Sequence, residues 1–259
     1  MEIKHHPKPA FPLISCVCIT RGKPLLLRIA IACFLDQTYP NKELVIIYED
    51  DDQPTGDVVR RLLPHPAINA IMVARKWNIR LGRLRNLGIQ SAAGEYICQW
   101  DDDDWFHPGR LDYQYKSVLE SGLGGCIMRR WLLFNASEGK GYISHIRTWE
   151  GSLFCRADLL RSKKYLNRRS GEDTVVLDSL IAEGMIHYMD EAPFLYIYTY
   201  HGRNTWGYSH WKGLFRKGIP LSDEVNALIG KLYLFGNDGK IGSDRLTEVF
   251  KNIPLQSNG

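Results

Sequence analysis

Short apolar runs alternate with helix-like segments through the first half of this chain, and this alternation restricts the accessible folds more than any other feature. The runs that indicate strands cover residues 13–19, 44–48, 70–73 and 95–99. The segments typical of helices cover residues 24–35, 57–63 and 81–92. Strands that are apolar along their whole length lie in sheets with both faces covered. The sequence therefore predicts an α/β fold with a Rossmann-like, mostly parallel sheet flanked by helices.

The second half of the chain has a less regular pattern. It contains short strand-like runs at 125–130 and 194–200 and one clear helical segment at 173–182. We expect this part to complete the sheet as a smaller, mixed half of the same single domain. The predicted organisation is a flexible N-terminus, two halves of one domain and a C-terminal tail, over residues 1–11, 12–122, 123–235 and 236–259.

Polar residues follow three of the predicted strands. Thr20 and Arg21 come after the first strand, residues 49–52 after the second, and residues 101–104 after the fourth. In open parallel sheets, ligands bind beyond the carboxyl ends of the strands. We therefore expect these three clusters to lie together and to form the functional site.

Four consecutive aspartates, Asp101–Asp104, stand between two tryptophans. Like charges at the end of a buried strand repel one another, so folding alone gives little reason for them. A hard divalent cation such as Mg²⁺ or Mn²⁺ relieves the repulsion, because it takes carboxylate oxygens and commonly shares them with phosphate. The cluster therefore indicates a site for a metal and a diphosphate; the alternative is a solvated acidic turn.

Composition excludes several classes of protein. The chain has 259 residues, of which 44% are hydrophobic and 24% charged, which is ordinary for a globular domain. Its 33 basic and 29 acidic residues give a net charge of +4, too small to indicate a nucleic-acid partner. The six cysteines form no CxxC pair and no zinc-like spacing, so they are expected to be buried thiols in a reducing compartment.

Residues 1–12 lack the apolar core of a signal peptide, and no apolar run approaches the ~20 residues that span a bilayer. We therefore expect a cytoplasmic location. The alternative is a peripheral membrane contact through an aromatic and basic segment near the C-terminus, which contains Trp211, Lys212, Leu214, Phe215, Arg216 and Lys217.

Five segments together resemble the family-2 glycosyltransferases, which are nucleotide-sugar enzymes of the GT-A fold. In order along the chain they are PLIS at 12–15, QTYPN with ELVII at 37–47, RNLGI at 85–89, GEYI at 94–97 and WDDDDW at 100–105. The resemblance implies that residues 12–122 bind the nucleotide sugar and residues 123–235 bind the acceptor and carry the catalytic base. It also implies an inverting transfer that depends on Mn²⁺ or Mg²⁺.

The resemblance assigns roles residue by residue. The aspartates match the DxD motif with Asp101-x-Asp103, so that Asp103 would ligate the metal together with Asp101 and His201. The residues implied to bind the nucleotide are Thr20, Arg21, Glu49 or Asp50, Arg85, Asp101 and Asp102. The alternative role for Arg85 is a salt bridge that anchors its helix to the acidic loops.

Glu172 and Asp173 resemble the family's Glu-Asp base motif, with Asp173 as the expected base and Glu172 as the second choice. An acceptor hydroxyl needs such a base to lose its proton as it attacks. The alternative is that these acids only begin a helix, where they meet its dipole favourably. The residues implied to bind the donor sugar or the acceptor are Trp149, Gly151 and Arg203.

These features predict a metal-dependent inverting glycosyltransferase. Its expected partners are a nucleotide-diphosphate sugar, with a UDP-sugar as first choice, and a glycan or lipid-linked acceptor in surface polysaccharide or lipopolysaccharide synthesis. One alternative is a non-catalytic nucleotide-sugar-binding module of the same fold. A nucleotidyltransferase is less favoured, because residues 20–24 contain a single glycine and no Walker pattern.

Overall fold

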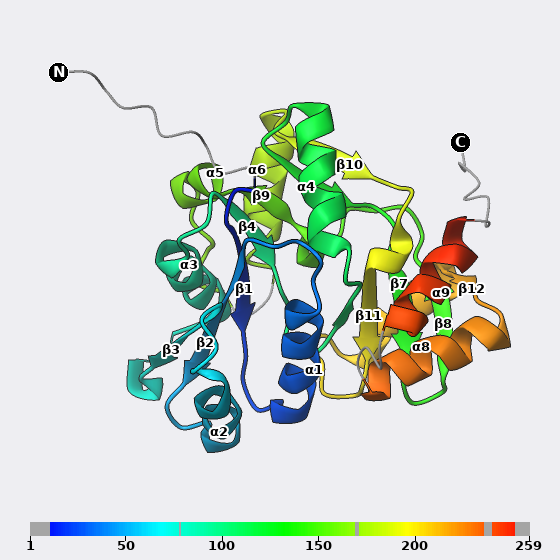
Figure 1. Cartoon of the computed structure of the whole chain (residues 1–259), viewed down its shortest axis with the longest axis horizontal. Helices are drawn as coiled ribbons and strands as arrows, with labels where there is room; N and C mark the ends of the chain where they lie inside the picture. The colour runs from blue at the N-terminus through cyan, green and yellow to red at the C-terminus, as the bar shows by residue number, and fades with distance from the viewer. Residues whose placement is uncertain (1–10, 78, 169–170, 236–239, 252–259) are drawn as a thin grey trace.

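The computed structural model describes residues 11–77, 79–168, 171–235 and 240–251, and its centre is a seven-stranded sheet (Figure 1). The strand order is β10-β6-β9-β4-β1-β2-β3. These strands span Ile14–Ile19 (β1), Lys42–Glu49 (β2), Ile68–Val73 (β3), Tyr96–Gln99 (β4), Gly125–Met128 (β6), Phe154–Arg156 (β9) and Ile186–Met189 (β10). All neighbours pair in parallel except β9, which is antiparallel to both β4 and β6. The predicted α/β fold with a mostly parallel sheet is confirmed.

Helices cover both faces of this sheet, which explains why its strands are apolar on both sides (Figure 1). One face packs against α1 (Pro24–Leu35), α2 (Gln53–Leu62) and α4 (Arg110–Ser121). The other packs against α3 (Leu81–Ser91), α5 (Ala157–Ser162) and α6 (Thr174–Ala182). All six cysteines are buried and free, as expected from their apolar surroundings.

A second sheet of five strands has the order β12-β8-β7-β11-β5. Its strands span Trp105–Phe106 (β5), Leu132–Asn135 (β7), Lys140–Ile143 (β8), Tyr196–Tyr200 (β11) and Ile219–Pro220 (β12). Strand β4 ends at Gln99 in the first sheet, and β5 begins at Trp105 in the second. The four aspartates therefore occupy the crossover from one sheet to the other.

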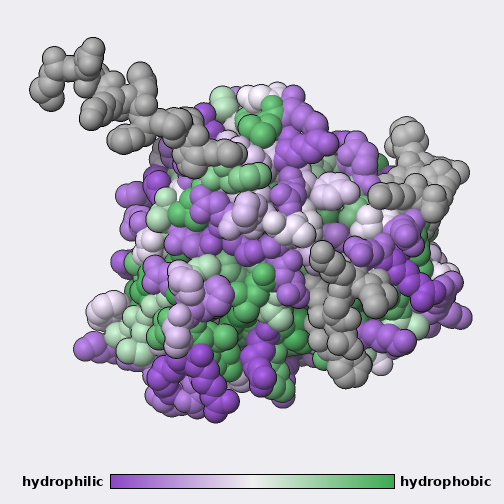
Figure 2. All heavy atoms as spheres, viewed as in Figure 1, coloured by the Kyte–Doolittle hydropathy of each residue, from purple (hydrophilic) through white to green (hydrophobic). Residues whose placement is uncertain are grey.

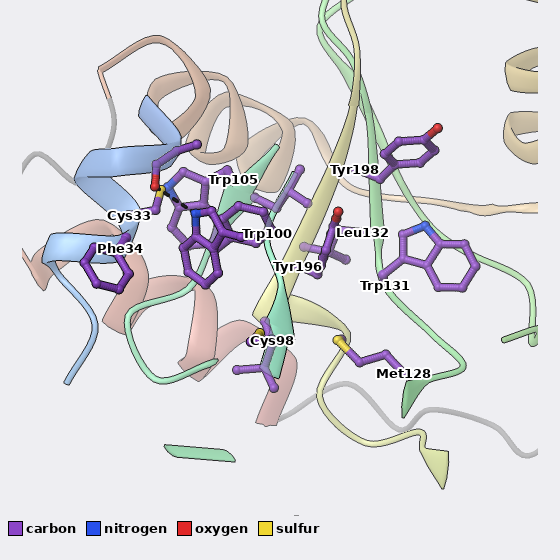
Figure 3. Packing of buried hydrophobic residues seen from close by; sticks show 14 of the residues in the cluster. Cys33, Phe34, Cys98, Trp100, Trp105, Met128, Trp131, Leu132, Tyr196 and Tyr198 are labelled. Carbon is purple, nitrogen blue, oxygen red and sulfur yellow. Dashed lines mark hydrogen bonds between the residues drawn. The ribbon is translucent and has the colours of Figure 1, made fainter. Parts of the chain in front are cut away.

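Trp100 packs in the core beside this crossover (Figure 3). Its indole Nε1 donates a hydrogen bond to the Ala30 carbonyl in α1 at 3.0 Å, and its ring centroid lies 4.0 Å from that of Phe106. Both side chains are fully buried. The aromatic residues on either side of the aspartates thus fix the strand ends between which the acidic loop runs.

The C-terminal part of the chain forms α7 (Tyr208–Lys217), α8 (Asp223–Phe235) and α9 (Lys240–Lys251). Helix α9 lies inside the segment 236–259 for which the sequence predicts a tail, so that prediction is corrected. Leu246 and Phe250, four residues apart, are buried, and Phe250 stacks on Phe194 at 6.3 Å. Residues 236–239 and 252–259, and the predicted flexible N-terminus apart from Phe11, lie outside the described residues.

The apolar side of α7 faces the protein. Trp211 and Leu214 are buried, and Phe215 packs against the core, whereas Lys212, Arg216 and Lys217 are exposed. The apolar residues of the segment named for an alternative membrane contact are therefore engaged in internal packing, and the basic residues of the same helix remain exposed. No helix in the described part of the chain is long and apolar enough to cross a membrane. On the face shown in Figure 2, hydrophilic residues surround smaller areas of hydrophobic ones.

His107 joins the crossover to α9 through its buried ring. The Gly109 amide donates to Nδ1 at 3.0 Å, so the proton of the neutral ring lies on Nε2, which is 2.9 Å from Thr247 Oγ1 and 3.3 Å from the Ser243 carbonyl. Burial lowers the pKa of His107 from 6.5 to about 4. Protonation of the ring in the folded state would also place a proton on Nδ1, where it would face the N–H of Gly109.

A lowered histidine pKa stabilises the fold fully above pH 6.5 and less as the pH falls towards 4. Between pH 7 and pH 4.5 we expect this linkage to remove about 2–3 kcal/mol of unfolding free energy. The substitution His107→Asn keeps an acceptor for the Gly109 amide and removes the titrating group. Urea unfolding at the two pH values should therefore show a smaller loss for the variant, and equal losses in both proteins would contradict this role.

Candidate active site

A cleft of about 720 Å³ opens at the carboxyl ends of β1, β2 and β4. This volume is typical of a site for a small organic ligand. The cleft brings together most of the residues that the sequence singles out, namely Thr20, Arg21, Glu49, Arg85, Asp101, Asp102, Asp103, Trp149, Gly151, Glu172, Asp173 and Arg203. The parallel pairing of β2, β1 and β4 is what carries the three polar clusters to one edge of the sheet.

Asp104 differs from the other three aspartates because it points into the protein. It is 2% exposed and accepts hydrogen bonds from the Tyr196 hydroxyl at 2.6 Å and the Thr199 amide at 3.0 Å. Burial, together with the neighbouring Asp103 and Asp101, raises the pKa of Asp104 well above its usual range. Asp104 therefore fastens the acidic loop to β11 and leaves Asp101, Asp102 and Asp103 to line the cleft.

Asp103 lines the cleft and contacts His201, which directly follows β11 and is not itself among the residues that line the cleft. His201 Nε2 lies 2.9 Å from Asp103 Oδ2, and Lys23 Nζ donates to the same oxygen at 2.7 Å. Lys23 Nζ also lies 3.1 Å from Asp102 Oδ1. Burial alone would raise the pKa of Asp103, but the hydrogen bond with His201 and the charge of Lys23 bring it below its usual value. Burial raises the pKa of Asp102 to about 6.

Carboxylate oxygen and imidazole nitrogen form a donor pair that Mn²⁺ accepts, and Mg²⁺ favours the carboxylate oxygens. Within the described residues, no group of three or more His, Cys, Asp or Glu side chains is arranged to hold a metal ion. Asp103 and His201 therefore fit a metal ion as two of its ligands, which is only part of a full ligand set. The remaining ligands would come from a bound diphosphate and water, which is common for Mg²⁺.

The acidic segment after β2 is held by two arginines. Glu49 is buried and forms ion pairs with Arg21 and with Arg75, whose Nη1 lies 2.9 Å from Glu49 Oε1. Asp50 lies apart from the cleft lining, and its carboxylate accepts from the Arg75 amide at 2.8 Å. Of the two sequence candidates, the structure thus brings Glu49 into the cleft and gives Asp50 a turn-stabilising contact. Arg75 was missed by sequence reasoning, although it follows the end of β3.

Glu172 and Asp173 are adjacent in sequence but have different surroundings. Glu172 is 1% exposed, and its Oε1 accepts from Arg85 Nε at 2.8 Å. Arg85 also approaches Asp101, with Nη2 3.7 Å from Oδ1. The ion pair considered as an alternative role for Arg85 is therefore present.

Asp173 is the N-cap of α6, with its carboxylate 3.1 Å from the Thr174 amide, and it opens onto the cleft. Of the two acids, Asp173 is the one placed to meet an incoming group.

The far side of the cleft is aromatic. Trp149 stacks on Trp131 with ring centroids 5.1 Å apart and packs against Tyr198 at 4.3 Å. A Cβ on Gly151 would lie 2.9 Å from both Asp101 Oδ2 and Trp149 Nε1, so only glycine allows this close approach. Next to Arg203, the half-exposed Trp206 stacks on His210 at 5.1 Å. The stacked Trp206–His210 pair was not among the sequence candidates.

A model described as "Glycosyl transferase family 2" matches residues 15–176, and the chain belongs to this family. The family resemblance inferred from the five segments is thus confirmed.

Two curated relatives align with less than half of the chain. Glycosyltransferase GlyA of Streptococcus pneumoniae serotype 4 is 26% identical over 116 residues, which are 45% of this chain and 16% of the relative. The putative glycosyltransferase EpsH of Bacillus subtilis is 28% identical over 107 residues, 41% of this chain and 30% of the relative. This chain therefore aligns with less than a third of the length of either relative.

Solved structures of low sequence identity share the GT-A-type fold. S. aureus TarS 1–349 in complex with UDP-GlcNAc has a TM-score of 0.60 at 14% identity. The alignment covers 92% of this chain and 71% of the TarS chain. The mannosyltransferase PcManGT from Pyrobaculum calidifontis, in complex with GDP-Man and Mn²⁺, has a TM-score of 0.58 at 15% identity. The alignment covers 99% of this chain and 80% of the mannosyltransferase chain.

The different surroundings of Asp104 and Asp103 predict different costs of removal. Asp104→Ala leaves the buried Thr199 amide without its acceptor and leaves the Tyr196 hydroxyl only the more distant Asp101 Oδ2, at 3.1 Å, so we expect a loss of about 1–3 kcal/mol of unfolding free energy. Asp103→Ala removes one carboxylate from a crowded acidic loop, so its loss should be less than half as large. Urea unfolding of both variants measures the difference, and equal losses would show that Asp104 has no special structural role.

Proposed function

We propose that this protein is a metal-dependent, inverting glycosyltransferase that moves a sugar from a nucleotide-diphosphate sugar to an acceptor hydroxyl. A UDP-sugar is the first choice of donor, and the acceptor is a glycan or lipid-linked sugar in surface polysaccharide or lipopolysaccharide synthesis. The observation that carries the proposal is that Asp103, with His201 beside it, and the open carboxylate of Asp173 belong to one cleft. Diphosphate binding and proton removal can therefore take place around one bound donor.

In this proposal the nucleotide lies along the carboxyl ends of β1 and β2. Glu49 and its partner arginines would meet the base, and Thr20 would approach the nucleoside. Thr20 is buried and lines the cleft beside Asp102. The diphosphate would then lie over Asp101, Asp102 and Asp103. A metal ion held by Asp103 and His201 would offset the negative charge of the departing diphosphate.

Asp173 would act as the base. Its carboxylate would take the proton of the acceptor hydroxyl while the hydroxyl oxygen forms a bond to the anomeric carbon. The bond from that carbon to the diphosphate oxygen would break at the same time, and its electron pair would leave with the diphosphate. Attack from the face opposite the leaving group inverts the anomeric centre. Glu172 would hold Arg85 towards Asp101 rather than touch the reacting atoms.

The aromatic side of the cleft suits a sugar acceptor. Trp206 is 44% exposed and stacks on His210, so one indole face is backed while part of the ring stays open to solvent. Such flat apolar surfaces pack against the C–H groups of sugar rings. Arg203 and Arg147 line the same part of the cleft and would meet hydroxyl or anionic groups of the acceptor. Trp149 and Gly151 would limit the space for the donor sugar.

The donor class can be identified by thermal unfolding with UDP, GDP, CDP and dTDP, each with and without Mn²⁺. At ~100 times its dissociation constant, the matching nucleotide should add ~2.7 kcal/mol to stability. We expect UDP to give the largest shift and Mn²⁺ to increase it in the wild type but not in Asp103→Ala. The absence of a shift with every nucleotide would leave the cleft without a donor and contradict the proposal.

Asp173→Asn should keep nucleotide binding and lower the rate of sugar transfer by about 10²–10⁴-fold, because the amide cannot accept the acceptor proton. Asp178→Asn, on an exposed position of the same helix α6, is the matched control and should leave the rate unchanged. Transfer and nucleotide affinity are measured separately for both variants. A wild-type protein that binds the nucleotide without any transfer or hydrolysis would instead favour the non-catalytic binding module.

A further inference from the structure

Lys23 lines the cleft and has no role in the proposed mechanism. It lies in the short loop between β1 and α1, directly before Pro24. Its ammonium group is 2.7 Å from Asp103 Oδ2 and 3.1 Å from Asp102 Oδ1, and its side chain is 18% exposed. A lysine with this much of its stem buried is held in one place rather than free in solvent.

The loop that carries Lys23 is fixed along its length. The Thr20 amide donates to the Ile47 carbonyl at 3.0 Å. Arg21 forms ion pairs with Glu49 and Asp51, and the Gly22 amide donates to Asp52 Oδ2 at 2.6 Å. Gly22 has φ +68°, a conformation that favours glycine and turns the chain sharply before Lys23. The loop thus aims the ammonium group at the cleft aspartates.

One oxygen, Asp103 Oδ2, is shared by Lys23 and His201. A metal held between Asp103 and His201 would therefore approach the oxygen that the ammonium group already contacts. Two cations at one carboxylate oxygen repel each other, so both cannot hold it at full strength. A diphosphate over the aspartates would instead offer Lys23 new anionic oxygens within the reach of its flexible stem, and lysine commonly binds phosphate as a point charge.

We propose that Lys23 is the resident cation of the diphosphate site: it compensates Asp102 and Asp103 in the free protein and turns to the diphosphate when a nucleoside diphosphate binds. This inference rests on the proposed function, since it assigns a further residue to the same donor site. It has two consequences. Part of the affinity for a nucleoside diphosphate persists without metal, and Lys23 weakens metal binding to the free protein.

The test is to titrate UDP, and GDP in parallel, into the wild type, Lys23→Met and Lys23→Arg by calorimetry, in EDTA and in Mn²⁺. Without metal, Lys23→Met should bind the nucleotide about tenfold more weakly than the wild type, and Lys23→Arg should keep most of the affinity. Lys76→Met is the matched control, because Lys76 is exposed in η1 (Arg75–Trp77) and does not line the cleft. Unchanged affinity of Lys23→Met in EDTA would overturn the proposal.

A second measurement needs no nucleotide. Free Mn²⁺, followed by its paramagnetic resonance signal, should be bound about tenfold more tightly by Lys23→Met than by the wild type, because a competing charge has been removed. Equal or weaker Mn²⁺ binding in the variant would also overturn the proposal.

The wild type alone separates the two proposals and remains informative if Lys23→Met does not fold. No binding of UDP, GDP, CDP or dTDP even with Mn²⁺ refutes the proposed function. Binding with Mn²⁺ that vanishes completely in EDTA refutes only the role of Lys23.

Discussion

The site depends on the way one buried carboxylate holds the acidic loop. Asp104 accepts from Tyr196 and Thr199, so a loop that leaves the first sheet at β4 is fastened to β11 of the second. Behind it, the buried guanidinium of Arg110 lies 4.7 Å from the Phe106 ring and 5.0 Å from that of Tyr196. Arg110 also donates to the carbonyls of Gln99 at 3.0 Å and Gly151 at 3.3 Å. One cation therefore ties together the strand before the aspartates and the loop opposite them, and it offsets part of their charge from within the core.

Basic side chains from other elements form ion pairs with other acidic side chains of the cleft. Arg21 and Arg75 hold Glu49, Lys23 holds Asp102 and Asp103, and Arg85 holds Glu172. A cleft with so many carboxylates would otherwise repel an anionic ligand. Each pair also fixes a side chain that a flexible surface acid would leave mobile. The free protein thus already holds these charges in fixed positions, and under the proposed function a donor would exchange their partners rather than create a site.

The sequence predicted the first sheet well because its signals are local. The strands at 13–19 and 44–48, the helix begun by Pro24 and the polar residues after each strand all appear where expected. The second sheet was harder, since β5 is only two residues long and pairs with β11, ninety residues away. Ion pairs between residues far apart in sequence could not be predicted for the same reason. Nothing near Lys23 or Arg75 in the sequence shows which acidic residue each will contact. Helix α9 was missed because its burial depends on Phe194 and on α8, not on its own pattern.

The Glu172-Asp173 pair shows how a fold can give two neighbouring acids different chemistry. Gly171 turns the chain with φ +65°, and α6 begins one residue after Asp173. This turn sends Glu172 inwards, where Arg85 takes one of its oxygens and the other, Oε2, has no partner among the described residues. Asp173 stays at the helix start, where its carboxylate accepts from the Thr174 amide at 3.1 Å. A base must be reachable: Asp173 opens onto the cleft, whereas Glu172 is buried and paired with Arg85. Glu172 instead holds the guanidinium of Arg85 within 3.7 Å of Asp101, so the two neighbouring acids are not interchangeable.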